Sequence, residues 1–530
     1  MERTLAISSM LVALVILALC STVAWQQVGL LTIPFDTDES DHANAGIEVY
    51  SAVKSGESRA VTQSLTRQGF YPPINSIALA TSYLALGPSY ASSRWPSVIF
   101  YILTALLLGI LTYNCACALD ITPNFARSAA AISIFLFATS DIATRNSALC
   151  MLEPLATLLA ALVFLFLQKR KAGALFALGL ALLLMAVTLT KYSFGILLLP
   201  GIFLGLALPT NGQSLSRNAR ELALCLAIFF GLLGLWLIVT DREAAWHFLV
   251  GHPSNAPMFS AENLLYEVRA YLNEYCISTP VAALTLLCAL LGTLTFWRKS
   301  ELVRVSTCSI FASLGILLLS TTNEPRHFMV AIPPIFLLAS LGAVTLIEKQ
   351  RTRISQIALM LFLAVIFLTP FPKFLDTRAG AIRQELEGRP GWAELQTQII
   401  KSHPPGEALL IIGATDDFSL EALRWLEAKS YGLPYTATKI DSFPFDQKRD
   451  FRDLRRKRNR SILALSPFRD SSVEEVITRG PYKSVALIRS IGARNQSYEI
   501  FKRALAAVEA KITFRKTADD KEIILAKIRE

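Results

Sequence analysis

A cluster of acidic residues follows the first apolar run of the chain. The stretch PFDTDESDHANAG, residues 34–46, holds four carboxylates within six positions, namely Asp36, Asp38, Glu39 and Asp41. One acid is enough to cap a helix and to favour its dipole, and a cap at Ser40 or Asp41 predicts a short amphipathic helix over 42–56. Because four acids exceed that need, we expect Asp38 or Glu39 to have a chemical function.

A metal site is one alternative for these acids. His42 follows Asp38 by four residues in the same acidic stretch. Carboxylate oxygens and imidazole nitrogens both bind divalent metal ions. Asp38, Glu39 and His42 are therefore a candidate metal site, and the sequence predicts no other cofactor.

A further candidate acid, Glu153, lies just inside an apolar run in RNSALCMLEPLATLLAALVFLF, residues 145–166. A carboxylate within a membrane segment is costly unless it is paired or faces a polar cavity, so it is a functional candidate. The alternative is a structural ion pair with Arg145 near the membrane interface. The sequence leaves both interpretations open.

Isolated cations stand at the ends of other apolar runs. Lys191 lies in LTLTKYSFGILLLP (187–200), and Arg326 and His327 lie in TNEPRHFMVAIPP (322–334). Each cation could simply extend to lipid headgroups. Acids together with scattered cations at one membrane face would instead suit an anionic, lipid-linked substrate.

Composition indicates the element that must position these residues, a membrane-spanning helix bundle. Of the 530 residues, 53% are apolar and only 17% are charged, whereas soluble proteins have about 25% charged residues. The mean hydropathy is +0.45. Eleven apolar runs come near the length that spans a bilayer, at about 5–25, 94–113, 124–141, 147–167, 172–190, 193–209, 221–240, 278–297, 302–321, 327–347 and 355–371.

Loop charges predict the orientation of this bundle. With the N-terminus inside, basic clusters such as QKRK (168–171) and EKQRTR (348–353) fall in inside loops, as the positive-inside rule requires. The acidic loop (26–93) then lies on the extracytoplasmic side. Residues 72–87 are too short to span and open with two prolines, so they predict an interfacial or re-entrant helix in that loop.

The C-terminal part of the chain differs from the rest. We expect residues 1–372 to form a transmembrane domain and 373–530 an extracytoplasmic domain. Strand-like runs alternate there with helical patterns, which favours a small α/β fold; the strands are expected at 407–414, 461–467 and 483–490, and the helices at 419–432 and 498–512. The net charge of +10 lies mostly in this region, and no motif indicates nucleic-acid binding.

Several of these motifs recur in order in a known family. Asp38–Glu39, the pair Pro72–Pro73, Gly87–Ser89 and Arg94–Pro96 resemble the pattern of polyprenyl-phosphate-sugar-dependent GT-C glycosyltransferases. That clan contains the protein O-mannosyltransferases and the lipid A aminoarabinose transferases. LTKYSFGILLLP and PRHFMVAIPP resemble two later landmarks, and the resemblance extends over about 350 residues.

The resemblance implies a mechanism. Asp38 would be the general base that deprotonates an acceptor hydroxyl, with Glu39 beside it and Glu153 as the second acid of the site. Lys191 and Arg326 would hold the donor phosphate and stabilise the charge that develops as it departs. His327 and Tyr71 would also belong to the phosphate-binding residues. A single direct displacement would invert the anomeric centre.

The predicted protein is a multi-pass membrane glycosyltransferase of a bacterial inner membrane. Its partners would be a polyprenyl-phosphate-linked sugar donor, membrane lipids, and a lipid, glycan or protein acceptor on the periplasmic face. The alternatives are a transporter or flippase of a lipid-linked or anionic substrate, and a non-catalytic membrane scaffold. A transporter would show paired helix breaks and mid-span charges, whereas these charges gather at span ends.

Overall fold

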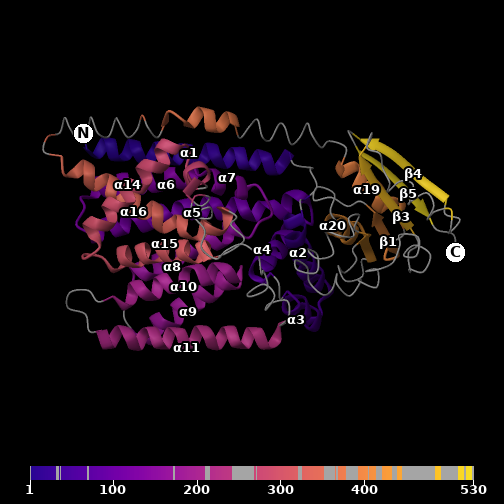
Figure 1. The fold of residues 1–530 in the computed structure, drawn as a ribbon, viewed down its shortest axis with the longest axis horizontal. Coiled ribbons are helices and arrows are strands. Elements are labelled where there is room, and N and C mark those ends of the chain that lie inside the picture. The colour runs from indigo at the N-terminus through magenta and orange to yellow at the C-terminus, as the bar shows by residue number, and fades with distance from the viewer. Residues whose placement is uncertain are drawn as a thin grey trace. The chain divides into compact units, whose positions relative to one another are not determined.

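The structure is a computed structural model of the chain (Figure 1). It describes residues 2–30, 35, 37–68, 71–170, 173–208, 215–240, 265, 268, 269, 271–319, 325–350, 352, 365, 368–377, 392–403, 405–412, 420–431, 439–443, 484–490, 506, 511–518 and 521–527. The chain divides into two compact units. Unit 1 comprises Met1–Gln27, Ser97–Thr240 and Pro253–Gly380, and unit 2 comprises Val28–Pro96, Asp241–His252 and Ala381–Glu530.

Unit 1 is a bundle of apolar helices that lie side by side (Figure 1). Its helices are α1 (Glu2–Leu30), α5 (Tyr90–Ala118), α6 (Pro123–Ala138), α7 (Asp141–Ser147), α8 (Glu153–Gln168), α9 (Ala174–Thr188), α10 (Tyr192–Ala207), α11 (Leu215–Val239), α14 (Thr279–Phe296), α15 (Glu301–Leu319) and α16 (Ile332–Glu348). A π-helical turn, η1 (Tyr271–Tyr275), precedes α14, and a 3₁₀ turn, η2 (Pro325–Ala331), precedes α16. Helices α1 and α5 begin or end in residues of unit 2.

Glycines allow two helix pairs in this bundle to approach closely. Helix α14 packs on α16 at Gly292 and Gly342, and a Cβ atom on Gly342 would lie 1.9 Å from the carbonyl oxygen of Cys288. Helix α10 packs on α15 in the same way, where a Cβ on Gly201 would lie 2.2 Å from Cα of Ser309. Small residues at helix contacts let backbones meet, which is how bundles gain packing energy in lipid.

The helices of unit 1 confirm an integral membrane protein but not the number of spans. Among the described residues, six helices are long and apolar enough to cross a membrane, or seven if the bent pair α6 and α7 is one span. Helices α8, α9 and α10 coincide with predicted spans but have only 15 or 16 residues. The eleventh run, 355–371, lies mostly outside the described residues, so eleven spans stay a prediction.

The fourth predicted span begins later than the apolar pattern indicates. Helix α6 ends at Ala138, and α7 continues at an angle of 62° to it. A short non-helical stretch follows, and α8 begins at Glu153 rather than near residue 147. The break places Glu153 at a helix N-terminus, where its charge suits the helix dipole.

Unit 2 opens with the acidic segment. Helix α2 (Thr37–Ser55) starts earlier than a cap at Ser40 or Asp41 would allow, so that predicted boundary is wrong, and Asp38 and Glu39 lie in its first turn. Helices α3 (Ser58–Thr66) and α4 (Ile74–Leu86) follow and pack against α2. The predicted short helix over 72–87 is α4, and its exposed side chains include the apolar Ile77, Leu84 and Leu86.

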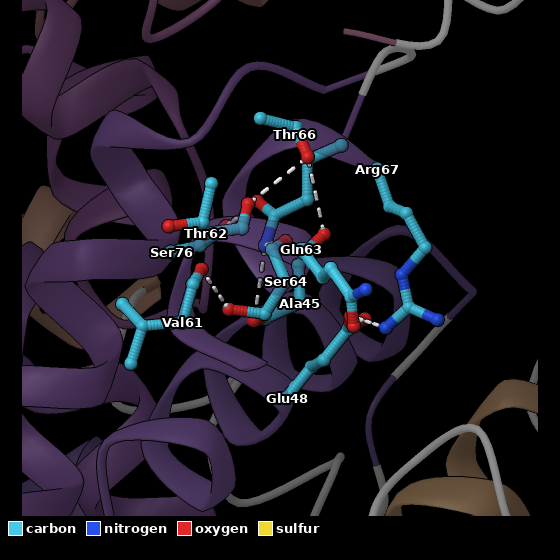
Figure 2. Close-up of polar contacts among 10 residues, drawn as sticks. Ala45, Glu48, Val61, Thr62, Gln63, Ser64, Thr66, Arg67 and Ser76 are labelled. Atoms are coloured by element: carbon cyan, nitrogen blue, oxygen red, sulfur yellow. Dashed lines mark hydrogen bonds and ion pairs between the residues drawn. The ribbon is translucent and has the colours of Figure 1, made fainter. Parts of the chain in front are cut away.

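Polar contacts join α3 to α2. Figure 2 shows Arg67, directly after α3, forming an ion pair with Glu48 of α2. The side chain of Gln68 donates to the carbonyl oxygen of Ser64 at 2.9 Å and accepts from Ser76 at 2.5 Å. Gln68 thus connects the last turn of α3 to Ser76 of α4.

Among the described residues, the C-terminal part of unit 2 contains a five-stranded mixed sheet with strand order β2-β1-β3-β5-β4. Strands β1, β3, β4 and β5 are labelled in Figure 1. Its strands are β1 (Ala408–Ile412), β2 (Lys439–Phe443), β3 (Ser484–Ser490), β4 (Lys511–Ala518) and β5 (Lys521–Lys527). Strand β1 is parallel to β2 and β3, while β5 is antiparallel to β3 and β4. Helices α19 (Trp392–Ser402) and α20 (Leu420–Tyr431) pack against the sheet.

Strands β1 and β3 and helix α20 fall where the sequence predicts them. The predicted strand at 461–467 lies outside the described residues. The predicted helix over 498–512 extends too far, because residues from Lys511 form β4. Ile512 and Phe514 alternate with polar residues there, which is the period of a strand. An independent extracytoplasmic α/β domain over 373–530 stays a prediction.

Candidate functional site

Glu153 is the centre of a charged cluster in unit 1. It is the first residue of α8, and Pro154 follows it in the first turn, where a missing N–H costs nothing. Its side chain is buried, with 1% of its surface exposed. A buried carboxylate requires a charged partner, because removal from water strongly penalises an isolated charge.

Two cations supply that partnership. Lys191 Nζ lies 3.3 Å from Glu153 Oε1, and Arg326 Nε lies 4.0 Å from the same oxygen. Lys191 is the N-cap of α10 in the turn that follows α9, and it is also buried. Arg326 belongs to η2, directly before α16. We call Glu153, Lys191 and Arg326 the charged triad.

Hydrogen bonds to the neighbouring residues hold the backbone beside two members of the charged triad, Lys191 and Arg326. The indole Nε1 of Trp236, in α11, donates to the hydroxyl of Tyr192, the residue after Lys191, at 2.9 Å. The hydroxyl of Tyr275, in η1, donates to the carbonyl oxygen of Pro325 at 2.6 Å, one residue before Arg326. The sequence gives no signal for either contact, because the partners are far apart along the chain.

Arg145 is not the described ion-pair partner of Glu153. It lies in α7, and its Nη2 is 2.7 Å from Oε2 of Glu274 in η1. The alternative in which Arg145 neutralises Glu153 is therefore wrong. The cations that lie beside Glu153, Lys191 and Arg326, are those to which the family resemblance assigns the donor phosphate.

A different network stands at the opposite end of α8. Arg170, two residues after α8 ends, contacts Glu301 at 2.6 Å and Glu221 at 2.8 Å. Helix α8 has 16 residues, so the two clusters are separated by ~24 Å along its axis. Among the ion pairs that the structure describes, one cation faces two acids here, whereas in the charged triad two cations face one acid.

Unit 2 contains Asp38 and Glu39, which we call the acid pair. Glu39 is buried, and its two oxygens accept hydrogen bonds from Nε and Nη2 of Arg94, both at 2.8 Å. Arg94, near the start of α5, is itself 1% exposed. This is a two-pronged arginine–carboxylate pair, the strong geometry for such contacts. Asp38, the preceding residue, is only partly buried.

Two further predicted residues of unit 2 lie together. The rings of His42 and Tyr71 meet edge to face, with centroids 4.6 Å apart. His42 is buried, and Tyr71 is partly buried. In unit 1, His327 is partly buried in η2 beside Arg326.

The residues proposed as metal ligands do not fit a metal ion. Among the described residues, no group of three or more His, Cys, Asp or Glu side chains is arranged to hold one. Both oxygens of Glu39 are bonded to Arg94, and the ring of His42 packs on Tyr71. The prediction of a site at Asp38, Glu39 and His42 is not supported, and we derive no step through a metal.

The predicted site residues therefore fall into two sets. Unit 1 brings Glu153, Lys191 and Arg326 together, with His327 adjacent. Unit 2 holds Asp38 and Glu39 in one helix turn, and His42 and Tyr71 in contact. The partnership of Arg94 with Glu39 was missed, although an arginine at the start of an apolar run was a signal for a buried ion pair.

Comparison with solved structures gives the fold class. No protein-family model matches the sequence, and neither does any curated protein sequence. The aminoarabinose transferase ArnT from Cupriavidus metallidurans bound to undecaprenyl phosphate is similar over 97% of both chains, with a TM-score of 0.61 and 14% identity. Its apo state gives a TM-score of 0.59.

An archaeal structure is also similar. The oligosaccharyltransferase from Archaeoglobus fulgidus in complex with Zn and sulfate matches 89% of this chain and 67% of its own, with a TM-score of 0.52 and 11% identity. Both neighbours are GT-C glycosyltransferases. At these identities the likeness establishes the fold, and the chain has the fold of this class.

Proposed function

We propose that the protein is a membrane glycosyltransferase that moves a sugar from a polyprenyl-phosphate carrier to a hydroxyl acceptor. The charged triad is the observation that carries this proposal. It lies in a fold shared with an enzyme whose structure holds undecaprenyl phosphate, and its charges suit a phosphate group. The order of motifs in the sequence points to the same reaction.

The charge balance of the charged triad favours an anion. Lys191 and Arg326 carry two positive charges against the single negative charge of Glu153. At an effective dielectric constant of about 20, unit charges ~4 Å apart interact by about 4 kcal/mol. A phosphate that approaches the two cations would gain attraction from both and oppose one carboxylate, so binding is favourable. The same cations would stabilise the phosphate as it departs.

Asp38 is the better candidate for the base. Glu39 is tied by both oxygens to Arg94, so its function is to hold the first turn of α2 in place. Asp38 is partly accessible in the same turn, as a base must be if it is to meet an acceptor hydroxyl. We assign the proton transfer to Asp38 and the positioning to Glu39.

The reaction is a direct displacement. The acceptor oxygen forms a bond to the anomeric carbon, and the bond from that carbon to the phosphate oxygen breaks. The proton of the acceptor hydroxyl passes to Asp38, and the electron pair leaves with the polyprenyl phosphate. Because one displacement inverts configuration, the anomeric centre of the product is opposite to that of the donor. Phosphate is a good leaving group, so the step requires no general acid.

Location follows from the loop charges. The basic clusters at 168–171 and 348–353 belong inside, which puts the acid pair, the charged triad and the C-terminal residues on the extracytoplasmic face. An undecaprenyl-type donor in a bacterial inner membrane would present its sugar on that face. The acceptor is a lipid, glycan or protein hydroxyl.

The test is a transfer assay with purified protein in lipid nanodiscs. Polyprenyl-phosphate sugars with a radiolabelled sugar are incubated with membrane lipid, glycan and protein acceptors, and labelled product is counted. Removal of a general base costs about 100- to 10,000-fold, so Asp38→Asn should lower kcat by that factor. Asp41→Asn, which changes a neighbouring acid of α2 in the same way, is the matched control and should retain most activity.

One result would overturn the proposal, and another would overturn its assignment of the base. If wild-type protein transfers no sugar from any polyprenyl-phosphate donor, the chain is not an enzyme of this type. Transfer by Asp38→Asn at the wild-type rate would remove the base assignment while leaving the reaction class.

A further inference from the structure

We propose that the C-terminal residues position the acid pair of α2, and that Trp425 is the residue through which they act. The inference rests on the proposed function only in that Asp38 and Glu39 are taken as part of the catalytic site. It assigns a role to α20, which lies beyond the sequence motifs that resemble a known family.

Trp425 is one of three aromatic rings that pack against one another. Its ring centroid is 4.9 Å from that of Phe35 and 4.9 Å from that of Tyr90, and Phe35 and Tyr90 are 4.8 Å apart. We call these three residues the aromatic cluster. Trp425 is fully buried, and Phe35 is too. Helix α20 packs directly against α2.

The aromatic cluster joins the acid pair through Arg94. Phe35 precedes Asp38 by three residues and stands just before the first turn of α2. The guanidinium carbon of Arg94 lies 5.1 Å from the centroid of the Phe35 ring, and the same guanidinium binds both oxygens of Glu39. A continuous chain of contacts therefore runs from Trp425 through Phe35 and Arg94 to Glu39.

The contacts of Trp425 are those of a ring that supports its neighbours. Among the residues that the structure describes, its indole Nε1 has no hydrogen-bond partner. A buried donor without a partner costs free energy, so the aromatic contacts must outweigh that cost. The ammonium of Lys429, one turn along α20, lies 5.2 Å from the Trp425 ring and 5.8 Å from the Tyr90 ring, and adds a second contact between α20 and the cluster.

The alternative is that α20 simply completes the fold of the C-terminal sheet. That role would be met by the residues of α20 that face α19 and β2. It would not require the largest ring of the helix to pack on Phe35 and Tyr90, which come from the other end of the sequence. The packing of the Trp425 ring on Phe35 and Tyr90 therefore favours a role in supporting α2.

The experiment measures α2 itself and catalysis in the same full-length variants. Amide hydrogen exchange is followed by mass spectrometry for peptides covering Thr37–Ser55, with peptides from α8 as an internal reference. Trp425→Ala should raise exchange in α2 by about tenfold or more and leave α8 unchanged. In the transfer assay, kcat should fall by about 10- to 100-fold, as for a misplaced catalytic group, while KM for the donor stays within about twofold.

Two matched variants separate positioning from general loss of stability. Trp425→Phe keeps an aromatic ring and loses no described hydrogen bond, so it should restore α2 protection and at least half of kcat. Ile524→Ala removes a buried side chain of β5, in the same unit but outside the aromatic cluster, and should not raise exchange in α2 selectively.

Each remaining outcome is decisive. If Trp425→Ala leaves α2 exchange and kcat at wild-type values, or if Ile524→Ala has the same effect on both, the inference is overturned. If Trp425→Ala loosens α2 while the wild-type protein transfers no sugar, the structural inference is supported and the proposed function fails.

Discussion

The ion pair between Glu39 and Arg94 gives the most quantitative prediction. Both side chains are buried, and two hydrogen bonds of 2.8 Å join them. At a charge separation of ~4 Å and an effective dielectric constant of about 20, their attraction is about 4 kcal/mol. Removal of one partner from a buried pair typically costs about 3–5 kcal/mol, because the other charge is left without compensation.

A double-mutant cycle tests this value. Arg94→Met and Glu39→Met should each destabilise α2 by about 3–5 kcal/mol. The double variant leaves no buried charge, so it should be less destabilised than the sum of the two by about 3 kcal/mol. The free energy of local opening of α2 is measured by amide hydrogen exchange of the full-length protein in nanodiscs.

The same cycle separates structure from chemistry. Glu39→Met alone should lower both α2 stability and sugar transfer, and the double variant should recover part of each, because Asp38 regains its position. Additive effects, with a coupling energy below about 0.5 kcal/mol, would refute the claim that the pair acts as a unit. A double variant that regains stability but no transfer would mean that Glu39 itself takes part in the reaction.

Three further predictions concern other parts of the chain. Tyr275→Phe removes the partly buried hydrogen bond to the carbonyl oxygen of Pro325, the residue before Arg326. The free energy of unfolding should fall by about 1–3 kcal/mol and KM for the donor should rise, as measured by thermal unfolding and transfer kinetics. Gly342→Ala places a Cβ against the α14 backbone and should lower the melting temperature and folded yield, whereas Gly231→Ala, which has nothing within 4 Å, should not. Burial raises the pKa of the Glu427 carboxyl above its ordinary value of 4.5, because the folded protein favours the neutral form. The stability that the neutral carboxyl contributes is therefore lost as pH rises from 4.5 through the folded-state pKa. Glu427→Gln should therefore stabilise the protein at pH 7 and have no such effect at pH 4, as thermal unfolding at the two values would show.

Hydropathy was sufficient to predict most of the helices. Apolar runs in a chain of this composition have few alternatives to spanning helices, and each described run coincides with a helix. Helix ends were less predictable: Glu153 begins α8 because α7 turns away after a 62° bend, and no apolar pattern encodes that angle. The first turn of α2 was also missed, since four acids made a later cap look equally good.

The partners of charged side chains were the least predictable feature. The sequence marked Glu153 as costly in a membrane segment, which was informative, but the nearest cation along the chain, Arg145, was the wrong partner. Glu39 and Arg94 are 55 positions apart, and Trp425 and Phe35 are farther apart still. A single sequence contains periodicity and local spacing but no record of such pairs, so only the fold reveals them.

The most direct test of the account is whether the charged triad binds the phosphate of a polyprenyl carrier. Affinity for undecaprenyl phosphate is measured by native mass spectrometry of wild-type protein, Lys191→Met and Lys349→Met. Lys349 is the control because it is exposed and lies at the C-terminal end of α16, whereas Arg326 of the charged triad lies before its N-terminal end. Loss of a charged hydrogen bond costs about 1.5–3 kcal/mol, so Lys191→Met should bind at least about tenfold more weakly, while Lys349→Met and wild type bind equally. Undecaprenol, which lacks the phosphate, should bind none of the three detectably. Equal affinity of Lys191→Met and wild type, or equal binding of undecaprenol and undecaprenyl phosphate, would contradict the account.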